Sequence, residues 1–522
     1  MKYPIGIQTF EQIINNGFVY VDKTDMVYAL ATEGKTYFLS RPRRFGKSLL
    51  LSTLRAYFEG KKELFKGLKI DKLEKDWHAH RVLHIDFNGV VFTRPGALED
   101  ELDKQLSTWE VEYHLPKGTR EMYGWRFEQI VQAIYTETGR GAVVLIDEYD
   151  KPLLDVLEMD PELLNNNREI LKGFYSTFKK ADAYLRFVFL TGVTKFSQVS
   201  VFSGFNQPKD ISMYEQFEAL CGITEEELHT QFAKPIREMA QTENCTEEEM
   251  KLQLKKHYDG YHFSKQMTDI YNPFSVLNAF DSKDIRDFWF ATGTPTYLIR
   301  LMNHFNEGID ELTGREYSLD EFVNYKADTE YPLPMIYQSG YLTIKNYDRE
   351  MDMFLLDFPN NEVKRGFLAM VASNYLQSGQ PMDSWIKRAV LSLRRGQIDQ
   401  FRQMLTAFLA SIPYSMRRKD EERERERYFQ YTFYLLLRLM SVYTIYIEKE
   451  QSEGRVDCVI ETPQFVYIFE FKLDGTAAGA LQQIEDKGYA REYEADARPV
   501  HKIGVNFSSE TGTIEGWEHA IR

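Results

Sequence analysis

The sequence predicts an α/β protein built of several domains. In the N-terminal region, apolar segments typical of buried strands end in polar residues, and a helix-forming run follows the first of them. Near the C-terminal end, two further strand-like segments are joined by a short turn. The chain has 522 residues, which is enough for about three domains, because single domains usually hold about 100 to 200 residues.

The most informative segment is FLSRPRRFGKS, Phe38–Ser48, which lies between a hydrophobic strand and the helix-forming run LLLSTLRAYF. Its last residues match the end of a phosphate-binding loop, in which Gly46 and the following helix N-terminus surround a polyphosphate. Lys47 would reach the outer phosphates, and the Ser48 hydroxyl would ligate Mg²⁺. Arg41 stands where the first glycine of the usual spacing would be. A basic surface turn before an amphipathic helix therefore remains the alternative.

An acidic strand predicts the second half of such a site. The segment AVVLIDEYD, Ala142–Asp150, is an apolar run that ends in Asp147 and Glu148, as expected of a strand buried on both faces of a parallel sheet. Ligands of open α/β folds bind at the carboxyl ends of such strands. We expect Asp147 to hold Mg²⁺ and Glu148 to polarise an attacking water. The alternative is an ordinary core strand that ends in solvated acids.

A third apolar segment, Leu185–Leu190, ends at Thr191 and Gly192. The Thr191 hydroxyl would then stand at the same sheet edge, where it could sense the γ-phosphate or the attacking water. Capping of the next turn is an equally good interpretation of this residue.

The middle of the chain is predicted to be largely helical at first. Thr224 and Thr246 each precede a run of glutamates, which is typical of helix N-caps with favourable helix-dipole charges. Farther on, a helix that ends at Gly340 and two strands around a polar turn predict a winged-helix-like module. Because fold does not fix function, we interpret this module as a linker or protein-docking region rather than as a DNA reader.

The segment GRVDCVIETPQFVYIFEFKLD, from Gly454, predicts two strands around a turn at Pro463. Asp457 lies on the first strand, while Glu470 and Lys472 lie two residues apart on the second and so share one face. The two carboxylates would ligate a divalent cation, and Lys472 would orient or activate a water that attacks a phosphodiester. A solvated cross-strand ion pair is the alternative.

Together these motifs resemble the AAA-ATPase-like proteins of bacteria that carry a C-terminal PD-(D/E)XK nuclease-like domain. The phrases that carry the resemblance are RPRRFGKS, DEYDKP, LTGVTKFSQVSVFSGFNQPKDIS, YDGYHF, YNPFSVL and TGTPTYL, and the similarity runs from the region of Tyr3 nearly to the end of the chain. In that family the basic loop without its first glycine is usual. The resemblance implies a further acidic metal ligand, Glu426, on the first nuclease-core helix. Gln483 and Tyr489 would lie on a helix beside the hairpin, although their spacing departs from the Q-x-x-x-Y signature of one nuclease branch.

Composition restricts the location of the protein. The three cysteines, Cys221, Cys245 and Cys458, fit neither a disulfide framework nor a zinc site, which favours a reducing cytoplasm. The sequence has no apolar run of about 18 residues and no secretion signal. We therefore expect a cytoplasmic protein without a membrane segment.

A net charge of −15 argues against nucleic acid as a partner of the chain as a whole. Local patches decide such binding, however, and WIKRAVLSLRRGQIDQFR, Trp385–Arg402, could form a basic face beside the nuclease-like domain. The segment MRRKDEERERER, Met416–Arg427, mixes both signs and favours a solvated, ion-paired helix.

The sequence thus predicts a P-loop NTPase (AAA-like) core at 1–204, a helical lid at 205–287, a helical and winged-helix-like region at 288–411, and a PD-(D/E)XK nuclease-like domain at 412–522. The predicted nucleotide-binding residues are Arg44, Gly46, Lys47, Ser48, Asp147 and Thr191. The predicted metal ligands are Ser48, Asp147, Asp457, Glu470 and Glu426, and the predicted catalytic residues are Glu148, Asp457, Glu470 and Lys472.

We expect bound ATP and Mg²⁺ to set the domain arrangement that licenses or blocks a nuclease acting on DNA or RNA. Two alternatives remain open. The protein could be an ATP-dependent switch or scaffold that binds nucleic acid or another protein without cutting, or a nuclease whose loop no longer hydrolyses nucleotide. A protein partner at the winged-helix-like region and an oligomer are both compatible with the sequence.

Overall fold

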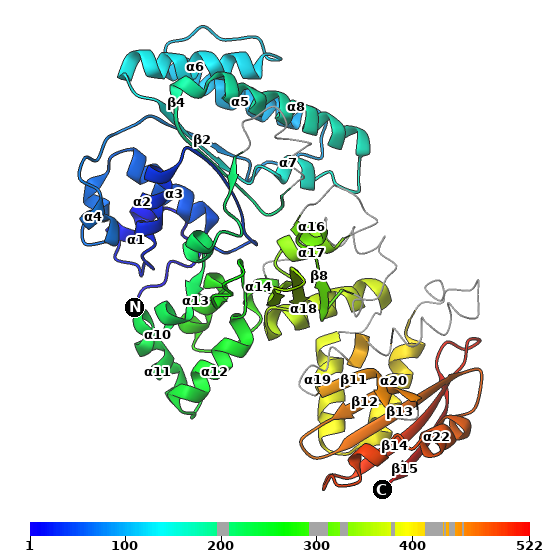
Figure 1. Cartoon of the computed structure of the whole chain (residues 1–522). Helices are drawn as coiled ribbons and strands as arrows, with labels where there is room; N and C mark the ends of the chain where they lie inside the picture. Colours follow the sequence, from blue (N-terminus) through cyan, green and yellow to red (C-terminus); the bar gives the residue numbers. More distant parts are fainter. Residues whose placement is uncertain are drawn as a thin grey trace. The chain divides into compact units, whose positions relative to one another are not determined.

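The structure is a computed structural model that describes residues 1–195, 208–291, 312–323, 332–376, 382–412, 432, 435–437, 444–451 and 454–522. The chain divides into two compact units, Met1–Lys364 and Arg365–Arg522, whose elements Figure 1 labels. Each unit is described by itself, and the three sequence-based borders between the four expected domains stay predictions. Among the described residues, no helix combines the length and apolar character that a membrane crossing requires.

A five-stranded parallel sheet forms the centre of the first unit, in the order β2-β3-β4-β1-β5. Its strands are β1 (Thr36–Ser40), β2 (Val82–Asp86), β3 (Ala142–Asp147), β4 (Leu185–Gly192) and β5 (Lys209–Asp210). Every residue of β3 is buried, which confirms the prediction from its unbroken apolar run. Because β1, β4 and β3 are paired in parallel, their carboxyl ends lie at one edge of the sheet, where Ser40 pairs with Gly192.

Helices cover both faces of this sheet (Figure 1), with α5, α6 and α8 on one face and α2 and α3 on the other. Right-handed crossovers explain why α3 lies on the face opposite to α5, α6 and α8. The connection from β1 to β2 crosses the sheet in one direction, and the connections from β2 to β3 and from β3 to β4 cross it in the other. The helices are α1 (Phe10–Asn15), α2 (Thr24–Glu33), α3 (Lys47–Phe58), α4 (Lys69–Leu73), α5 (Ala97–Glu112), α6 (Tyr123–Thr138), α7 (Lys151–Leu154) and α8 (Pro161–Lys180). Short 3₁₀ helices span Lys62–Phe65, Asp182–Tyr184 and Glu215–Leu220.

A group of helices follows the sheet, as the sequence predicts. They are α10 (Glu225–Gln231), α11 (Ala233–Thr242), α12 (Glu247–Tyr258), α13 (Pro273–Ser282) and α14 (Phe288–Ala291), with a two-stranded ribbon of β6 (Ile223–Thr224) and β7 (Ile270–Tyr271). Both predicted N-caps are confirmed, because Thr224 and Thr246 each form a complete capping box. Leu228, Ile236 and Met250 belong to the apolar core that these helices share.

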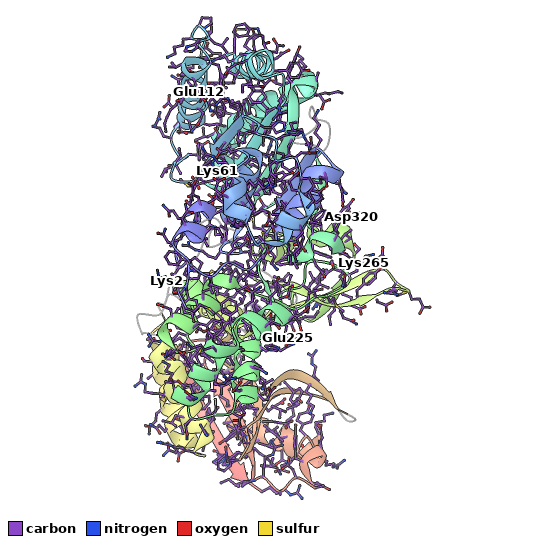
Figure 2. All side chains as sticks on the ribbon, turned by 90° about the vertical axis from the view of Figure 1, so that its left-hand side faces the viewer. Lys2, Lys61, Glu112, Glu225, Lys265 and Asp320 are labelled. Atoms are coloured by element: carbon purple, nitrogen blue, oxygen red, sulfur yellow. The ribbon has the colours of Figure 1, made fainter. Side chains whose placement is uncertain are left out.

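The middle region holds a helix and a hairpin where the sequence predicts them. Its elements are β8 (Arg315–Tyr317), α16 (Leu319–Val323), α17 (Leu333–Gln338), β9 (Thr343–Asp348) and β10 (Met353–Asp357), and the three strands form a sheet in the order β8-β10-β9. Lys265 lies against the hairpin (Figure 2) and donates to Tyr347 Oη at 2.7 Å and Asp352 Oδ1 at 3.0 Å. The identification with a winged helix stays a prediction. Helix α18 (Asn361–Leu376) follows and contains the border between the two units.

The second unit is a five-stranded mixed sheet in the order β11-β12-β13-β14-β15, in which only β13 and β14 run parallel. Its elements are α19 (Met382–Arg394), α20 (Ile398–Ala410), β11 (Thr444–Gln451), β12 (Gly454–Glu461), β13 (Val466–Leu473), α22 (Ala477–Asp486), a 3₁₀ turn (Arg491–Tyr493), β14 (Val500–Phe507) and β15 (Ile514–Ile521). The predicted hairpin is confirmed as β12 and β13. Helix α22 packs on β14 so closely that a Cβ on Gly504 would lie 2.2 Å from the Ala477 carbonyl oxygen.

Arg41, which follows β1, is a buried cation that ties the end of the strand to a distant segment. Its side chain is 1% exposed, and its guanidinium lies 4.1 Å from the centre of the Phe263 ring. The guanidinium donates to four backbone carbonyl oxygens, those of Ser40 (2.9 Å), Ser212 (2.7 Å), Phe217 (3.3 Å) and Glu218 (3.4 Å). Arg41 is therefore a structural residue that fixes the path of the chain after β1.

The segment YDGYHF holds a buried carboxyl group. Asp259 is 1% exposed, and neither of its side-chain oxygens has a hydrogen-bond partner among the described residues. The Nζ atom of Lys255 lies 3.7 Å from Asp259 and also contacts Glu225 at 2.8 Å and Asp269 at 2.7 Å. Burial, and after it the charge of Asp269, raises the pKa of Asp259 to about 7.

We predict that Arg41→Ala lowers the free energy of unfolding by on the order of 3 kcal/mol, because buried carbonyl oxygens lose their donor. Urea unfolding of the purified protein measures this change. Arg43→Ala is the matched control in the same loop, since Arg43 is exposed, and it should change stability by less than about 0.5 kcal/mol. Equal stability of the two variants would contradict the anchoring role of Arg41.

We also predict a pH signature of Asp259. A carboxyl whose pKa is raised on folding contributes stability below about pH 4 that is lost as the pH rises through about 7. The Asp259→Asn variant lacks this loss, so its stability relative to the wild type should increase by on the order of 3 kcal/mol between pH 4 and pH 8. Asp269, whose pKa is lowered mainly by its hydrogen bond with His262, offers the opposite case. Asp269→Asn should lose most stability at neutral pH, and parallel curves for the two variants would refute the assignment.

Candidate nucleotide and metal sites

The loop between β1 and α3 has the form of a phosphate-binding loop. Gly46 precedes the first residue of α3 and has a φ of 94°, in the left-handed region that favours glycine. Helix α3 then begins at Lys47, so the backbone N–H groups of its first turn face the loop. Arg41, in place of the first glycine, turns into the protein and leaves the inner side of the loop to other residues.

Lys47 is buried within its own loop. Its Nζ donates to the carbonyl oxygens of Arg41 at 2.9 Å and Pro42 at 3.1 Å. Burial lowers the pKa of Lys47, and the charges of Asp147 and Glu148 oppose that shift. The Lys47 ammonium group could bind a phosphate by exchanging these carbonyl oxygens for phosphate oxygens.

The carboxylate of Asp147 joins three elements at the sheet edge. Ser48 Oγ, from α3, donates to its Oδ2 at 2.6 Å, and Thr191 Oγ1, from β4, donates to its Oδ1 at 2.6 Å. The predicted metal ligands Ser48 and Asp147 are thus in direct contact, and Thr191 positions the carboxylate. This set of hydroxyl and carboxylate oxygens fits Mg²⁺, which prefers hard oxygen ligands.

Glu148 lies at the mouth of the same site in an unusual backbone conformation. Its φ is 52°, which is uncommon for a residue other than glycine. Burial raises the pKa of Glu148, and the charge of Lys47 is the main opposing effect. Next to it, the buried Asp150 accepts hydrogen bonds from the backbone N–H groups of Val193 (2.9 Å) and Thr194 (2.6 Å), which fixes the chain that leaves β4.

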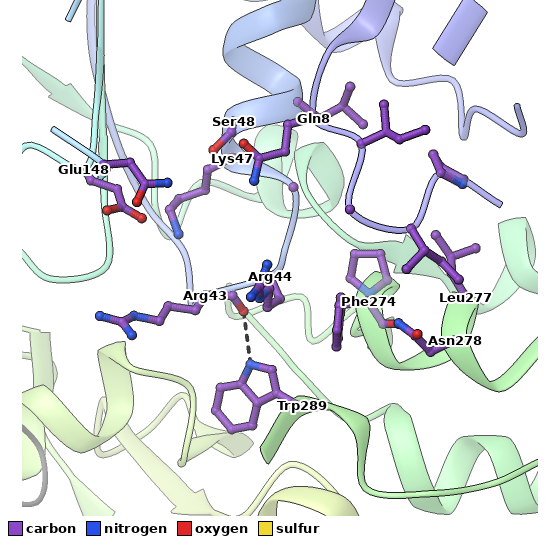
Figure 3. Close-up of a pocket in the computed structure, with 18 of the residues that line it drawn as sticks. Gln8, Arg43, Arg44, Lys47, Ser48, Glu148, Phe274, Leu277, Asn278 and Trp289 are labelled. Atoms are coloured by element: carbon purple, nitrogen blue, oxygen red, sulfur yellow. Dashed lines mark hydrogen bonds between the residues drawn. The ribbon is translucent and has the colours of Figure 1, made fainter. Parts of the chain in front are cut away.

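A pocket of about 440 Å³ opens beside the loop, within the size range of small-molecule sites. Its polar wall includes Arg43, Arg44, Lys47, Ser48 and Glu148, and its more apolar wall includes Pro4–Ile7, Pro273, Phe274 and Leu277. Figure 3 shows the two arginines on different sides, with Arg43 toward Glu148 and Arg44 toward Phe274. The indole N–H of Trp289 donates to the carbonyl oxygen of Arg43 at 3.3 Å. No residue spacing in the sequence indicates this apolar wall, although Phe274 lies in the phrase YNPFSVL.

The second site lies on the β12–β13 hairpin. Asp457 Oδ2 accepts a hydrogen bond from the backbone N–H of Phe471 at 2.8 Å, which holds this carboxylate beside β13. On β13, Glu470 Oε1 accepts from Gln483 Nε2, and Lys472 Nζ donates to Gln483 Oε1 at 2.6 Å. The structure therefore brings Asp457, Glu470 and Lys472 together, and Gln483 of α22 bridges the latter two.

Glu470 shows why this site fits a cation. Its side chain is 2% exposed, and its Oε2 has no hydrogen-bond partner among the described atoms. Burial and the charge of Asp457 raise the pKa of Glu470 to about 8. A divalent cation between the two carboxylates would partner the unpaired oxygen and remove their repulsion.

Other predicted residues of this region are placed as follows. Glu426 lies outside the described residues, as does the segment Met416–Arg427. Tyr489 donates to the carbonyl oxygen of Arg455 at 2.9 Å. Helix α19 exposes the cations Lys387, Arg388 and Arg394.

Comparisons with known proteins agree with this division. A family model described as "Predicted AAA-ATPase" matches residues 4–202, and one described as "PD-(D/E)XK nuclease superfamily" matches residues 424–517. The chain is also 36% identical over 525 residues to "Uncharacterized protein in vnfD 5'region" of Azotobacter chroococcum mcd 1, covering 99% of this chain and 98% of that protein. With the geometry of both sites, these matches show that the chain belongs to the family of AAA-ATPase-like proteins that carry a PD-(D/E)XK nuclease-superfamily domain.

Proposed function

We propose that the protein binds and hydrolyses ATP at the first site, and that its nucleotide state controls a metal-dependent phosphodiesterase for DNA or RNA at the second. The observation that carries the proposal is the contact of Asp147 with both Ser48 and Thr191 beside Lys47. Few arrangements other than a nucleoside triphosphate site need a buried lysine, a hydroxyl and a carboxylate at a helix N-terminus.

In the first site, each residue has a separate task. Lys47 and the N–H groups of α3 bind the β- and γ-phosphates, while Ser48 and Asp147 hold Mg²⁺, which neutralises phosphate charge when bound. Thr191 keeps Asp147 oriented through its hydrogen bond. Glu148, at the pocket mouth, orients a water and accepts its proton.

In the second site, Asp457 and Glu470 hold a divalent cation, which stabilises charge on the phosphodiester. Lys472 orients the attacking water, and Gln483 keeps Lys472 and Glu470 in register. These assignments follow from the charges and the hydrogen bonds of the four side chains.

A second candidate function is an ATP-dependent switch that binds nucleic acid or protein without cutting. It is favoured by Gln483, which occupies hydrogen-bonding positions on both Glu470 and Lys472, and by the raised pKa of Glu470, which keeps that carboxyl protonated near neutral pH in the absence of metal. The two functions differ in whether a cation displaces this closed arrangement.

We predict that Lys47→Ala weakens ATP binding by about 10- to 100-fold, because a charge-assisted contact with phosphate contributes about 1.5 to 3 kcal/mol. Titration calorimetry with ATP and Mg²⁺ measures the affinity. Lys62→Ala, which removes an exposed lysine elsewhere in the same unit, should bind like the wild type. Equal affinity of Lys47→Ala and wild type would refute the nucleotide site.

We predict that Lys472→Ala lowers cleavage of DNA or RNA in the presence of Mn²⁺ or Mg²⁺ by about 100-fold, as expected for loss of a group that acts on the attacking water. Gel assays with single- and double-stranded substrates follow the cleavage. The control variant Lys487→Ala removes an exposed lysine of the same unit and should cut normally. Absence of cleavage by the wild type with any metal, together with nucleotide-dependent binding, would instead support the switch.

A further inference from the structure

The loop after β1 carries three arginines whose side chains have separate environments. Arg41 is buried and bound to carbonyl oxygens, as described above. Arg43 and Arg44 are exposed and line the pocket. Two guanidinium groups therefore stand within the loop itself, where a phosphate-binding loop needs only backbone N–H groups and one lysine.

The two exposed arginines face different parts of the pocket. Arg44 has a φ of 71°, and its guanidinium lies 5.1 Å from the centre of the Phe274 ring on α13. Arg43 extends on the side of Lys47 and Glu148 (Figure 3). Arg43 and Glu148 both line this pocket, together with Lys47. Arg43 thus lies on the side where the terminal phosphate and the attacking water would meet.

The backbone at Arg43 is held in place from outside the loop. Its carbonyl oxygen accepts from the indole of Trp289, which is 6% exposed, and the Trp289 backbone N–H donates to the buried Glu362 at 2.6 Å. On the other side, a Cβ on Gly340 would lie 2.6 Å from the Pro42 ring, so the loop packs against the end of α17. These contacts fix the backbone from which the Arg43 side chain extends, which favours electrostatic stabilisation by a group already directed at the site.

We propose that Arg43 is the arginine that neutralises the transferring phosphoryl group, so that each chain supplies its own catalytic cation from its phosphate-binding loop. The inference rests on the proposed ATP hydrolysis. In that reaction a water oxygen forms a bond to the γ-phosphorus, the bond from that phosphorus to the β–γ bridging oxygen breaks, and ADP keeps the electron pair. The water proton passes to Glu148, and Arg43 bonds to the γ-phosphoryl oxygens as charge spreads over them.

Steady-state ATP hydrolysis by the full-length variants tests this role. Arg43→Ala should lower kcat by about 10³-fold with little change in KM, since an arginine of this kind acts on the transition state. Arg43→Lys keeps the charge but loses the planar fork of donors, and should recover only part of kcat. Arg44→Ala should mainly raise KM, and Arg55→Ala, an exposed arginine on α3, should match the wild type.

A mixing experiment separates a cation supplied within one chain from one supplied by a neighbouring copy. Arg43→Ala chains, with an otherwise intact site, are mixed with Lys47→Ala chains, which keep Arg43 but bind nucleotide poorly. Supply within one chain predicts no recovery of activity in the mixture, and a specific activity of the wild type that does not fall on dilution. Recovery in the mixture would overturn the inference.

The remaining outcomes are also decisive. Full kcat in Arg43→Ala overturns the inference and leaves the proposed hydrolysis intact. The same conclusion follows if Arg43→Ala loses kcat only because part of the protein is unfolded, so that the isolated folded fraction has the kcat of the wild type. Urea melts of the variant detect such unfolding. A wild type that binds ATP but never releases phosphate overturns the inference as well. A wild type that does not bind ATP at all refutes the proposed function itself.

Discussion

The position of Asp147 is the constraint on which the first site depends. Strand β4 separates β1 from β3, so the phosphate-binding loop and the acidic strand are not direct neighbours. Thr191 at the end of β4 fills this gap, and its hydroxyl joins Ser48 in holding the Asp147 carboxylate. With a different strand order, the same two motifs would be present in the sequence, but the Asp147 carboxylate would lie away from the loop. The arrangement of this candidate site is thus a property of sheet topology as much as of the motifs.

Features with a local physical cause could be predicted from the sequence. The buried strand ending at Asp147, the helix beginning at Lys47 and the capping boxes at Thr224 and Thr246 all depend on neighbours within a few residues. The hairpin with Glu470 on it follows from strand periodicity in the same way. The roles assigned to these residues remain proposals.

Features that depend on tertiary packing could not be predicted. Nothing in its neighbours indicates that Arg41 turns inward, since three of its four partner carbonyl oxygens belong to residues 171 to 177 positions later. The pocket wall likewise combines the N-terminal Pro4–Ile7 segment with Phe274 and Trp289. The sequence indicates Gln483 on a helix beside the hairpin, but its contact with Glu470 depends on how α22 packs against the sheet.

The two sites have opposite electrostatic needs, and that difference bears on the net charge of −15. The first site contains Lys47 and two arginines. Burial disfavours the charged form of Lys47 and lowers its pKa, so a bound anion would stabilise that charge. The second gathers carboxylates and raises the pKa of Glu470. Charges of the chain beyond about 8 Å are largely screened at physiological ionic strength, so local groups decide what each site accepts. On β13, Glu470 faces α22, whereas Tyr467, three residues earlier, points to the opposite face and donates to the Leu393 carbonyl oxygen of α19. The exposed cations of α19 therefore accompany the other face of the sheet and do not neutralise Asp457 and Glu470. Without a metal ion, the negative charge of Asp457 repels a phosphodiester, so the cation that would activate the proposed reaction would also admit its substrate.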